Sequence, residues 1–421
     1  MNNAKQISLF PAGEIRIPPS KSLSHRAVIC AGLAAIWGNG NSRIENLGDS
    51  EDIRATIECM QQLGAEYKYE NGYVIVGKAS ANTAVEKIMN CGESGSTLRF
   101  MLPITALFGE LFTYTGRGRL MERPLEIYEK LFAEKNVSFK RENDTLQING
   151  TLPAGEYCLP GNVSSQFVSG LLLALPLAHG NSRVVLETAL ESAAYVKLTL
   201  DVMQSFGINI TQPDDRTYEI TGGKSYNGCN YYVEGDYSQA AFFLAAGVLG
   251  QTVKCTGMRQ NSSQGDAAIV DILRQMNANV CWRGDTLAAE TAELTAVDID
   301  VREIPDLVPP IAVLCALAQG TSHITGAARL RIKESDRLEA VTRELAALGA
   351  DIIQGEDSLT ITGKPMLAGG NADAHNDHRI AMCTAVAAIK CKAPVYLTGW
   401  EHVSKSYPDF WLDFEKEQKN G

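Results

Sequence analysis

The stretch that decides the fold is CMQQLGAEYKYENGYVIVG, residues 59–77. Its first residues end an amphipathic helical pattern, Gly64 follows, and two short strand-like segments flank the turn around ENG. Gly and Asn best tolerate the left-handed backbone conformation that ends many helices. The stretch therefore predicts a helix, a turn and two paired strands.

Four other stretches repeat this pattern at nearly constant spacing. The Gly or Asn after each helix stands at positions 64, 136, 207, 277 and 349, so the steps are 72, 71, 70 and 72 residues. Such a period indicates a repeated supersecondary unit. A sixth helix, YPDFWLDFEKEQKN, has Asn420 at the next expected position, and we expect its strands to come from an N-terminal hairpin, KQISLFPAGEIRIP. The four other stretches are LFAEKNVSFKRENDTLQING, VMQSFGINITQPDDRTYEITG, LRQMNANVCWRGDTLAAE and LAALGADIIQGEDSLTITG.

A second series of helix starts is interleaved with the first. Each start is polar and precedes a small, apolar run such as FVSGLLLALPLA, which predicts a helix buried on all sides. Helix N-termini present unpaired N–H groups that suit phosphate and carboxylate. Ordinary N-caps would explain Tyr237 and Ser238, but they do not explain the cations near the other starts. The starts are Ser22, Ser94, Ser165, Tyr237, Asp306 and Asp377.

Length and composition bound the class of protein. A chain of 421 residues is too long for one core, and three repeats per domain give two domains. We expect residues 16–230 to form one domain and residues 231–421, completed by residues 1–15, to form the other. No run is long and apolar enough to span a bilayer, there is no signal-peptide pattern, and the ten Cys contain no C-x-x-C. These features predict a cytoplasmic protein with reduced thiols.

The net charge and its local distribution indicate which classes of ligand the protein can bind. The net charge of −11 argues against binding to nucleic acid or to an anionic membrane. Several cations nevertheless lie at or within a turn of the repeated helix starts, and a local cationic focus in an acidic protein suits a small, multiply anionic substrate. These cations are Lys21, Arg26, Arg123, Lys333, Arg337, Arg379 and Lys405.

Eight motifs in order, PPSKSLSHRA, GESGSTLR, RGRLMERP, VSSQF, NSSQGD, RIKESDRL, NDHRIAM and KSYPDF, resemble the 5-enolpyruvylshikimate-3-phosphate synthase family over essentially the whole chain. The resemblance implies an α/β, two-domain enolpyruvyl transferase-like fold with six βαβαββ units, three per domain, and an active site in the interdomain cleft. It implies transfer of the enolpyruvyl group of phosphoenolpyruvate to the 5-hydroxyl of shikimate 3-phosphate, with release of phosphate, in chorismate formation. No metal or organic cofactor is implied, and we expect a monomer.

The resemblance also assigns substrate contacts, residue by residue. Two phosphates and two carboxylates need dense cationic compensation, and Arg can grip either group bidentately. For phosphoenolpyruvate the implied residues are Lys21, Gly95, Arg123, Gln166, Arg337, Arg379 and Lys405. For shikimate 3-phosphate they are Lys21, Ser22, Arg26, Ser164, Ser165, Gln166, Ser192, Tyr195, Asp306, Lys333 and, as a weaker candidate, Arg329.

Addition followed by elimination needs a base for the hydroxyl and an acid/base for the methylene carbon. Asp306 and Glu334 are the candidates, and Lys21 is an alternative acid. From local sequence alone Asp306 is equally well an N-cap, and Glu334 could form a surface pair with Arg337 at i,i+3. Otherwise Lys333 and Arg337 could tune the ionisation of Glu334.

The chain departs from the family pattern at three places. Glu93 stands where many relatives have Asn, and it could cap its helix or pair with an Arg. The segment SAAY at 192–195 replaces the frequent SKPY, and Arg329 replaces an Asn of some relatives. These departures leave the contribution of the affected positions open.

Other functions fit the sequence less well. The sister transferase that acts on UDP-N-acetylglucosamine typically has a reactive Cys in a loop whose counterpart here, TGRGRLMERP, has none. A non-enzymatic repeat scaffold would not need convergent cations and acids. His375 and His378 lack a third metal ligand at fixed spacing, and His25 is interpreted as structural rather than catalytic.

Overall fold

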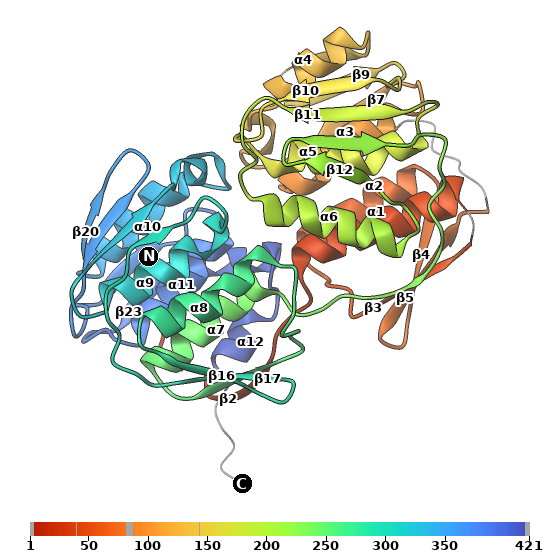
Figure 1. The fold of residues 1–421 in the computed structure, drawn as a ribbon. Helices are drawn as coiled ribbons and strands as arrows, with labels where there is room; N and C mark the ends of the chain where they lie inside the picture. Colours follow the sequence, from red (N-terminus) through yellow and green to blue (C-terminus); the bar gives the residue numbers. More distant parts are fainter. Residues whose placement is uncertain (1–3, 39, 81–86, 143, 417–421) are drawn as a thin grey trace. The chain divides into compact units, whose positions relative to one another are not determined.

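The computed structural model describes residues 4–38, 40–80, 87–142 and 144–416. The chain divides into two compact units, which Figure 1 colours along the sequence. The first unit is Pro19–Val233, and the second unit combines Met1–Pro18 with Glu234–Gly421. The expected domain boundaries, after residues 15 and 230, fall a few residues before these limits.

Among its described residues, the first unit contains three four-stranded sheets with one common pattern. In each sheet the first strand runs parallel to the second, and the third and fourth strands follow antiparallel, in the orders β14-β3-β5-β4, β6-β7-β9-β8 and β10-β11-β13-β12. The strands are β3 (Ser42–Glu45), β4 (Ala65–Glu70), β5 (Tyr73–Lys78), β6 (Ile88–Asn90), β7 (Phe112–Thr115), β8 (Ser138–Glu142), β9 (Thr145–Asn149), β10 (Glu156–Leu159), β11 (Ser182–Leu186), β12 (Thr211–Asp214), β13 (Thr217–Ile220) and β14 (Asn230–Tyr232). The helices are α1 (Lys21–Trp37), α2 (Glu51–Gln62), α3 (Gly95–Thr105), η1 (Leu120–Glu122), α4 (Glu126–Glu134), α5 (Ser165–Ala174), η2 (Leu175–Leu177) and α6 (Ala193–Ser205).

The second unit follows the same pattern in the sheets β2-β15-β17-β16 and β18-β19-β21-β20, with a three-stranded sheet β1-β23-β22. Its strands are β1 (Lys5–Ile7), β2 (Gly13–Arg16), β15 (Val253–Thr256), β16 (Asn279–Arg283), β17 (Thr286–Glu290), β18 (Ile299–Asp300), β19 (Thr321–Thr325), β20 (Asp351–Gln354), β21 (Leu359–Thr362), β22 (Gly370–Asp373) and β23 (Val395–Thr398). Its helices are α7 (Tyr237–Leu249), η3 (Gly265–Ala268), α8 (Ile269–Gln275), η4 (Pro305–Leu307), α9 (Val308–Ala316), η5 (Ala328–Ile332), α10 (Arg337–Ala347), α11 (His378–Ala388), η6 (Trp400–Lys405) and α12 (Phe410–Phe414).

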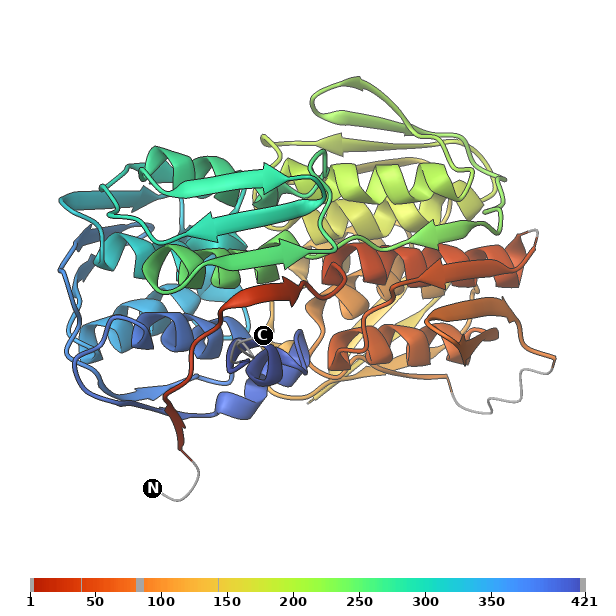
Figure 2. The ribbon, with the colours of Figure 1, turned by 90° about the horizontal axis from the view of Figure 1, so that it is seen from below.

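The expected N-terminal hairpin is wrong in one respect. β1 pairs antiparallel with β23, as the missing strand of the sixth repeat, but β2 pairs parallel with β15 in another sheet. Figure 2 shows the red strand β2 beside the green and teal strands of that sheet. Pro11, which has no N–H to donate, lies between the two strands, and β2 begins at Gly13 with φ of 77°. The segment therefore completes two sheets instead of folding on itself.

The periodic Gly and Asn positions have the backbone conformation that the pattern predicts. The φ angles of Gly64, Asn136, Gly207, Asn277 and Gly349 are 100°, 59°, 81°, 65° and 97°. Each follows a helix and precedes an antiparallel strand pair. This part of the repeat prediction is confirmed. The sixth position, Asn420, lies outside the described residues, and the last helix, α12, spans only Phe410–Phe414 within the longer expected segment.

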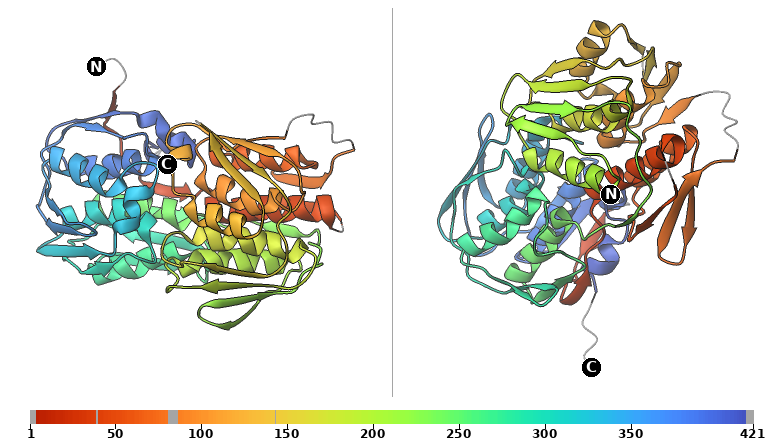
Figure 3. Two further views of the ribbon diagram at one scale, coloured as in Figure 1. Left: turned by 90° about the horizontal axis from the view of Figure 1, so that it is seen from above. Right: turned by 45° about the vertical axis from the view of Figure 1, so that its right-hand side comes forward.

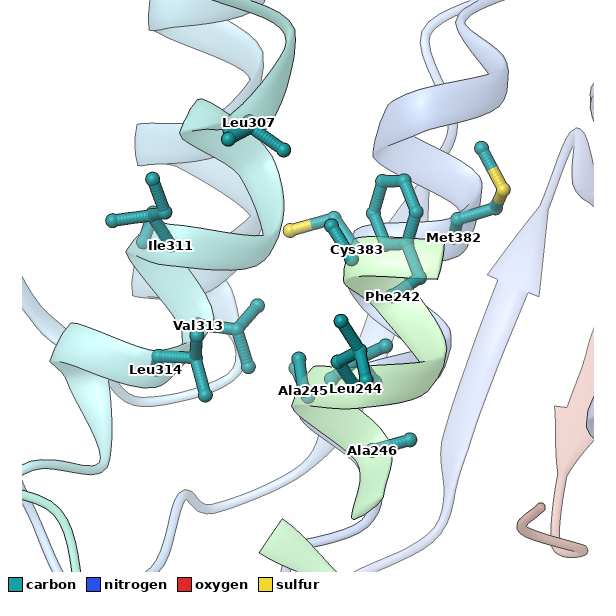
Figure 4. Close-up of a cluster of buried hydrophobic side chains, with 14 of the residues drawn as sticks. Phe242, Leu244, Ala245, Ala246, Leu307, Ile311, Val313, Leu314, Met382 and Cys383 are labelled. Atoms are coloured by element: carbon teal, nitrogen blue, oxygen red, sulfur yellow. The ribbon is translucent and has the colours of Figure 1, made fainter. Parts of the chain in front are cut away.

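The second helix series forms the buried helices, as predicted. Every residue of α7, α9 and α11 is buried, and these helices pack against one another. Figure 4 shows Phe242, Val313 and Met382 among the side chains that they contribute to this core. In the first unit α1 packs against α2 and α6, and α5 packs against α3 and α6; the long red helix of Figure 3 is α1. No helix in the described ranges is long and apolar enough to cross a membrane.

Candidate functional site

The start of α1 holds Lys21 and Ser22. Lys21 is the first helical residue, and its Nζ donates to Asp52 Oδ2 on α2 at 2.9 Å. Both side chains are mostly buried, at 19% and 12% exposed. An ion pair in this position keeps Lys21 at the helix start, where the macrodipole and the side chain both supply positive charge.

Arg26 lies one turn further along α1 and is 3% exposed. Its Nε donates to Thr199 Oγ1 at 2.8 Å, and its two terminal nitrogens donate to the backbone oxygens of Ser22 and Tyr195 at 2.7 and 2.8 Å. Burial lowers the pKa of the Arg26 guanidinium to about 10. Three neutral oxygens therefore fix this cation between α1 and α6.

The start of α3 brings Gly95 against Arg123. Ser94 caps the helix by accepting from the Thr97 N–H at 3.2 Å, and Gly95 is the first helical residue. A Cβ on Gly95 would lie 2.5 Å from Arg123 Nη1. The absence of a side chain at Gly95 thus lets the Arg123 guanidinium approach the backbone at the start of α3.

Arg99 is a buried cation that the sequence analysis did not select. Its Nη1 donates to Gln166 Oε1 at 2.7 Å, and its Nη2 donates to the backbone oxygen of Pro124 at 3.1 Å. The amide of Gln166 in turn donates to Ser96 Oγ at 2.8 Å. Arg99 thus holds both Gln166 and the segment next to Arg123. Its signal in the sequence is a single charge inside the otherwise uncharged helical run GSTLRFMLPIT.

The hydroxyls expected to bind the acceptor lie at two helix starts. Ser164 is the N-cap of α5 and accepts from the Gln166 N–H at 3.3 Å, and Ser165, buried, is the first helical residue. Ser192 precedes α6 in the left-handed conformation, with φ of 55°, and Tyr195 lies in the first turn. α5 and α6 pack against each other, so these starts belong to one part of the first unit.

In the second unit, Asp306 on η4 contacts three cations. Its Oδ1 accepts from Lys333 Nζ at 3.2 Å and from Arg337 Nη1 at 3.0 Å, and its Oδ2 accepts from Arg379 Nη2 at 3.2 Å. Arg379 Nη1 also donates to the Asp306 backbone oxygen at 3.1 Å. Burial raises the pKa of Asp306, but Arg379, Lys333 and Arg337 outweigh burial and hold this pKa well below its usual range.

Arg337 opens α10 and is held by three carboxylates. Its Nε and Nη2 donate to the two oxygens of Asp377 at 2.9 and 3.1 Å, Nη2 also donates to Glu334 Oε2 at 2.5 Å, and Nη1 donates to Asp306. Arg337 is 1% exposed and Asp377 is fully buried. Burial alone lowers the pKa of Arg337, but Asp377, Glu334 and Asp306 raise it overall. The pair of Glu334 and Arg337 is therefore not a surface pair.

The remaining expected cations of the second unit are Lys333, Lys405 and Arg329. Burial lowers the pKa of Lys333 despite the opposing effect of Asp306, and the charge of Arg329 contributes to the same direction. Lys405 is buried on η6, and its Nζ donates to the backbone and side-chain oxygens of Asn376 at 2.7 and 2.8 Å. The half-buried Arg329 lies on η5, four residues before Lys333.

The histidines have partners inside the protein. His375 Nε2 contacts Glu344 Oε1 at 2.7 Å, and His378 is buried on α11 beside Asp377. No group of three or more His, Cys, Asp or Glu suited to a metal occurs within the part of the chain that the structure describes. Glu93 does not cap α3, because Ser94 does. Its carboxylate lies against Gly118, where a Cβ would come within 2.8 Å of Oε2.

The family model for EPSP synthase (3-phosphoshikimate 1-carboxyvinyltransferase) matches residues 10–414. The chain belongs to the EPSP synthase family. A relative from Clostridium novyi named 3-phosphoshikimate 1-carboxyvinyltransferase is 45% identical over 99% of this chain and 97% of its own length. A protein of the same name from Clostridium kluyveri is 44% identical over 97% of this chain and 96% of its own length.

Solved structures agree with this membership. The EPSP synthase of Acinetobacter baumannii superposes with a TM-score of 0.79 at 25% identity, over 97% of this chain and 96% of its own. The enolpyruvyl transferase NikO from Streptomyces tendae has a TM-score of 0.78 at 19% identity, over 98% and 96% of the two chains, which shows a shared fold. The predicted α/β, enolpyruvyl transferase-like fold class is thereby confirmed.

Proposed function

We propose that this enzyme transfers the enolpyruvyl group of phosphoenolpyruvate to the 5-hydroxyl of shikimate 3-phosphate and releases phosphate. The observation that supports this most strongly is the family match, over nearly the whole chain, with relatives that carry this activity in their names. The reaction belongs to the shikimate pathway, which supplies chorismate and aromatic amino acids. We further propose a cytoplasmic monomer that needs no cofactor.

The substrate charges suit the clusters in both units. Each phosphate carries about −1.5 to −2 charges near neutrality, and each substrate adds a carboxylate. We assign the donor to Lys21, Gly95, Arg123, Gln166, Arg337, Arg379 and Lys405. We assign the acceptor to Lys21, Ser22, Arg26, Ser164, Ser165, Gln166, Ser192, Tyr195, Asp306, Arg329 and Lys333.

We assign the proton transfers to Asp306 and Glu334. Asp306 accepts the proton of the 5-hydroxyl as this oxygen adds to the central carbon of phosphoenolpyruvate, while the methylene carbon takes a proton from Glu334. The product of this step is a tetrahedral ketal phosphate. Glu334, which is now a carboxylate, then takes a proton from the new methyl group, and phosphate departs with the electrons of its C–O bond. Lys21 remains the alternative acid.

The low pKa of Asp306 makes the basicity of this carboxylate depend on the charge of its three cationic neighbours. The three cations that hold the pKa down are themselves assigned to substrate anions. A bound phosphate or carboxylate would offset their charge, so the pKa of Asp306 would rise toward the value a base requires. The carboxylate would then gain basicity when substrate is present to react.

An acceptor assay tests the proposal. Purified protein with phosphoenolpyruvate should release phosphate when shikimate 3-phosphate is added and not when UDP-N-acetylglucosamine is added. Segment 113–124, which would carry the reactive Cys of the sister transferase, contains none. Activity should survive exhaustive chelation. Phosphate release with the UDP-sugar instead would contradict the assignment.

A further inference from the structure

A row of buried polar side chains joins α1, α2 and the start of α3. His25 Nδ1 on α1 contacts Thr56 Oγ1 on α2 at 2.7 Å, Thr56 Oγ1 contacts Thr97 Oγ1 on α3 at 2.7 Å, and Thr97 Oγ1 contacts Ser94 Oγ at 2.7 Å. All four side chains are almost completely buried. We call His25, Thr56, Thr97 and Ser94 the polar row.

The hydrogen bonds of the polar row have one favoured direction. Each hydroxyl has a single proton, so if Thr97 donates to Ser94, Thr56 must donate to Thr97 and His25 Nδ1–H must donate to Thr56. In the opposite direction His25 Nε2 would carry a buried N–H, and this atom has no hydrogen-bond partner among the described residues. A buried N–H without an acceptor costs more free energy than a buried nitrogen lone pair without a donor. Burial, followed by Lys21 and Arg26, also holds the pKa of His25 well below its usual range, so the ring is neutral.

The polar row ends beside residues assigned to phosphoenolpyruvate. Ser94 caps α3 directly before Gly95, whose bare backbone accommodates Arg123. At the middle of the row, the hydroxyls of both threonines also approach the backbone oxygen of Asp52, at 3.2 and 3.4 Å. The carboxylate of Asp52 holds Lys21. The row therefore connects the helix start that carries Lys21 with the helix start that carries Gly95.

Packing alone would not require these hydroxyls. Valine has nearly the shape of threonine, so a Val pair at 56 and 97 could fill the same volume between the helices. A buried polar network that is well satisfied selects one relative placement of its elements, because other placements leave donors unpaired. Polar groups here thus add geometric definition to helices that already pack through apolar residues.

We propose that His25, Thr56 and Thr97 are positioning residues that fix the start of α3 relative to the start of α1 and so set the affinity for phosphoenolpyruvate. This inference rests on the proposed function, because it assigns Lys21 and Gly95 to the donor. None of the three needs to touch a substrate. Gly95 is assigned to the donor alone, whereas Lys21 is assigned to both substrates. The expected signature is therefore a larger increase in the KM for phosphoenolpyruvate than in the KM for shikimate 3-phosphate, with little change in kcat.

The threonines give the first test. Thr56→Val leaves the His25 Nδ1–H without its acceptor, and Thr97→Val leaves the Thr56 hydroxyl without the Thr97 acceptor. Each variant should raise the KM and the calorimetric Kd for phosphoenolpyruvate about five- to tenfold. The double variant should raise the KM for phosphoenolpyruvate by less than the product of the two single increases, because its second substitution removes a group that the first has already left unpaired. Thr105→Val is the matched control: Thr105 is buried at the other end of α3, and its hydroxyl contacts Tyr114. It should leave both KM values unchanged.

Histidine 25 gives the second test, which does not depend on the stability of the threonine variants. In His25→Asn the amide N–H can replace Nδ1–H, and this variant should keep the wild-type KM for phosphoenolpyruvate. His25→Leu removes the donor and should match Thr56→Val. Because the His25 ring is neutral, the pH dependence of this KM between about pH 6 and 8 should be the same for wild type and His25→Asn.

The outcomes separate the two proposals. If the wild-type protein releases no phosphate from phosphoenolpyruvate and shikimate 3-phosphate, the proposed function fails. If the wild type is active but the variants lower only the melting temperature, or raise both KM values equally, the positioning role is overturned. The same holds if His25→Asn and His25→Leu behave alike.

Discussion

Two buried arginines, Arg26 in the second turn of α1 and Arg337 at the first position of α10, are held in opposite ways. The hydrogen-bond acceptors of Arg26 are a hydroxyl and two backbone carbonyls, whereas Arg337 is bound by three carboxylates. Burial consequently lowers the pKa of Arg26, while the carboxylates overcome burial and raise that of Arg337. The charge of Arg26 is therefore not offset by these neutral acceptors and remains available to a bound anion. The charge of Arg337 is offset by the charges of its carboxylate partners.

The difference suggests different tasks. Three carboxylates and three cations meet in the second unit: Asp306, Glu334 and Asp377 with Lys333, Arg337 and Arg379. Such a network orients its carboxylates. An incoming anion can offset the charge of the cations that contact them and so raise their basicity, which suits proton transfer. The neutral oxygens around Arg26 leave its positive charge uncompensated, which suits the binding of an anion. The following predictions test this division.

The largest effect is expected at Asp306. Asp306→Asn keeps the shape and much of the hydrogen bonding but cannot accept the hydroxyl proton, so kcat should fall by about two to four orders of magnitude. The calorimetric affinity for shikimate 3-phosphate should change far less, because the binding that we propose for this ligand depends mainly on cations and N–H donors. Near-normal turnover would return Asp306 to a structural role and make Lys21 the leading candidate.

The two arginines should differ in what their loss does to stability. Arg337→Leu leaves Asp377 fully buried without its counter-ion and should lower the free energy of unfolding by about 3–5 kcal/mol. Arg26→Leu leaves neutral oxygens unpaired and should lower the free energy of unfolding by about 1–3 kcal/mol. Urea unfolding measures both values.

A second substitution checks the cause. Adding Asp377→Asn to Arg337→Leu removes the stranded charge and should recover part of the lost stability. Equal losses for the two arginine variants, or no recovery in the double variant, would contradict the contrast drawn between the units.

Much of the architecture was predictable because it depends on local conformational requirements. A residue that must adopt positive φ after a helix leaves a visible Gly or Asn, and five such positions gave the repeat. The pairing of β2 with β15 was not predictable in this way, since a four-residue strand carries no mark of the sheet it joins. Proximity in sequence suggested a hairpin, and long-range pairing overrode it.

The candidate site shows the same limit. Motifs identify Arg337 and Asp306, but sequence does not reveal that Asp377, 40 residues away, binds one edge of the Arg337 guanidinium through both of its carboxylate oxygens. Arg99 was overlooked because its partners, Gln166 and Pro124, lie on other segments. Which groups face one another depends on packing between helices, and helix starts alone do not encode it.

The smallest effect is expected at Gly95. A methyl group there would meet the end of the flexible Arg123 side chain, so the guanidinium should shift while the backbone stays in place. Gly95→Ala should therefore raise the KM for phosphoenolpyruvate by up to about tenfold, or 1.4 kcal/mol, with stability almost unchanged. The KM for shikimate 3-phosphate should stay constant.

The Arg123→Ala background decides how this methyl group acts. Arg123→Ala alone should weaken phosphoenolpyruvate binding by about 1.5–3 kcal/mol, because it removes a charge-assisted contact. If Gly95→Ala acts by displacing Arg123, it should add little in that background, since there is no guanidinium left to displace. An equal effect in both backgrounds would mean that the methyl group obstructs the substrate itself. The close approach of Arg123 to Gly95 would then be incidental to binding, and the start of α3 would contribute through its backbone alone.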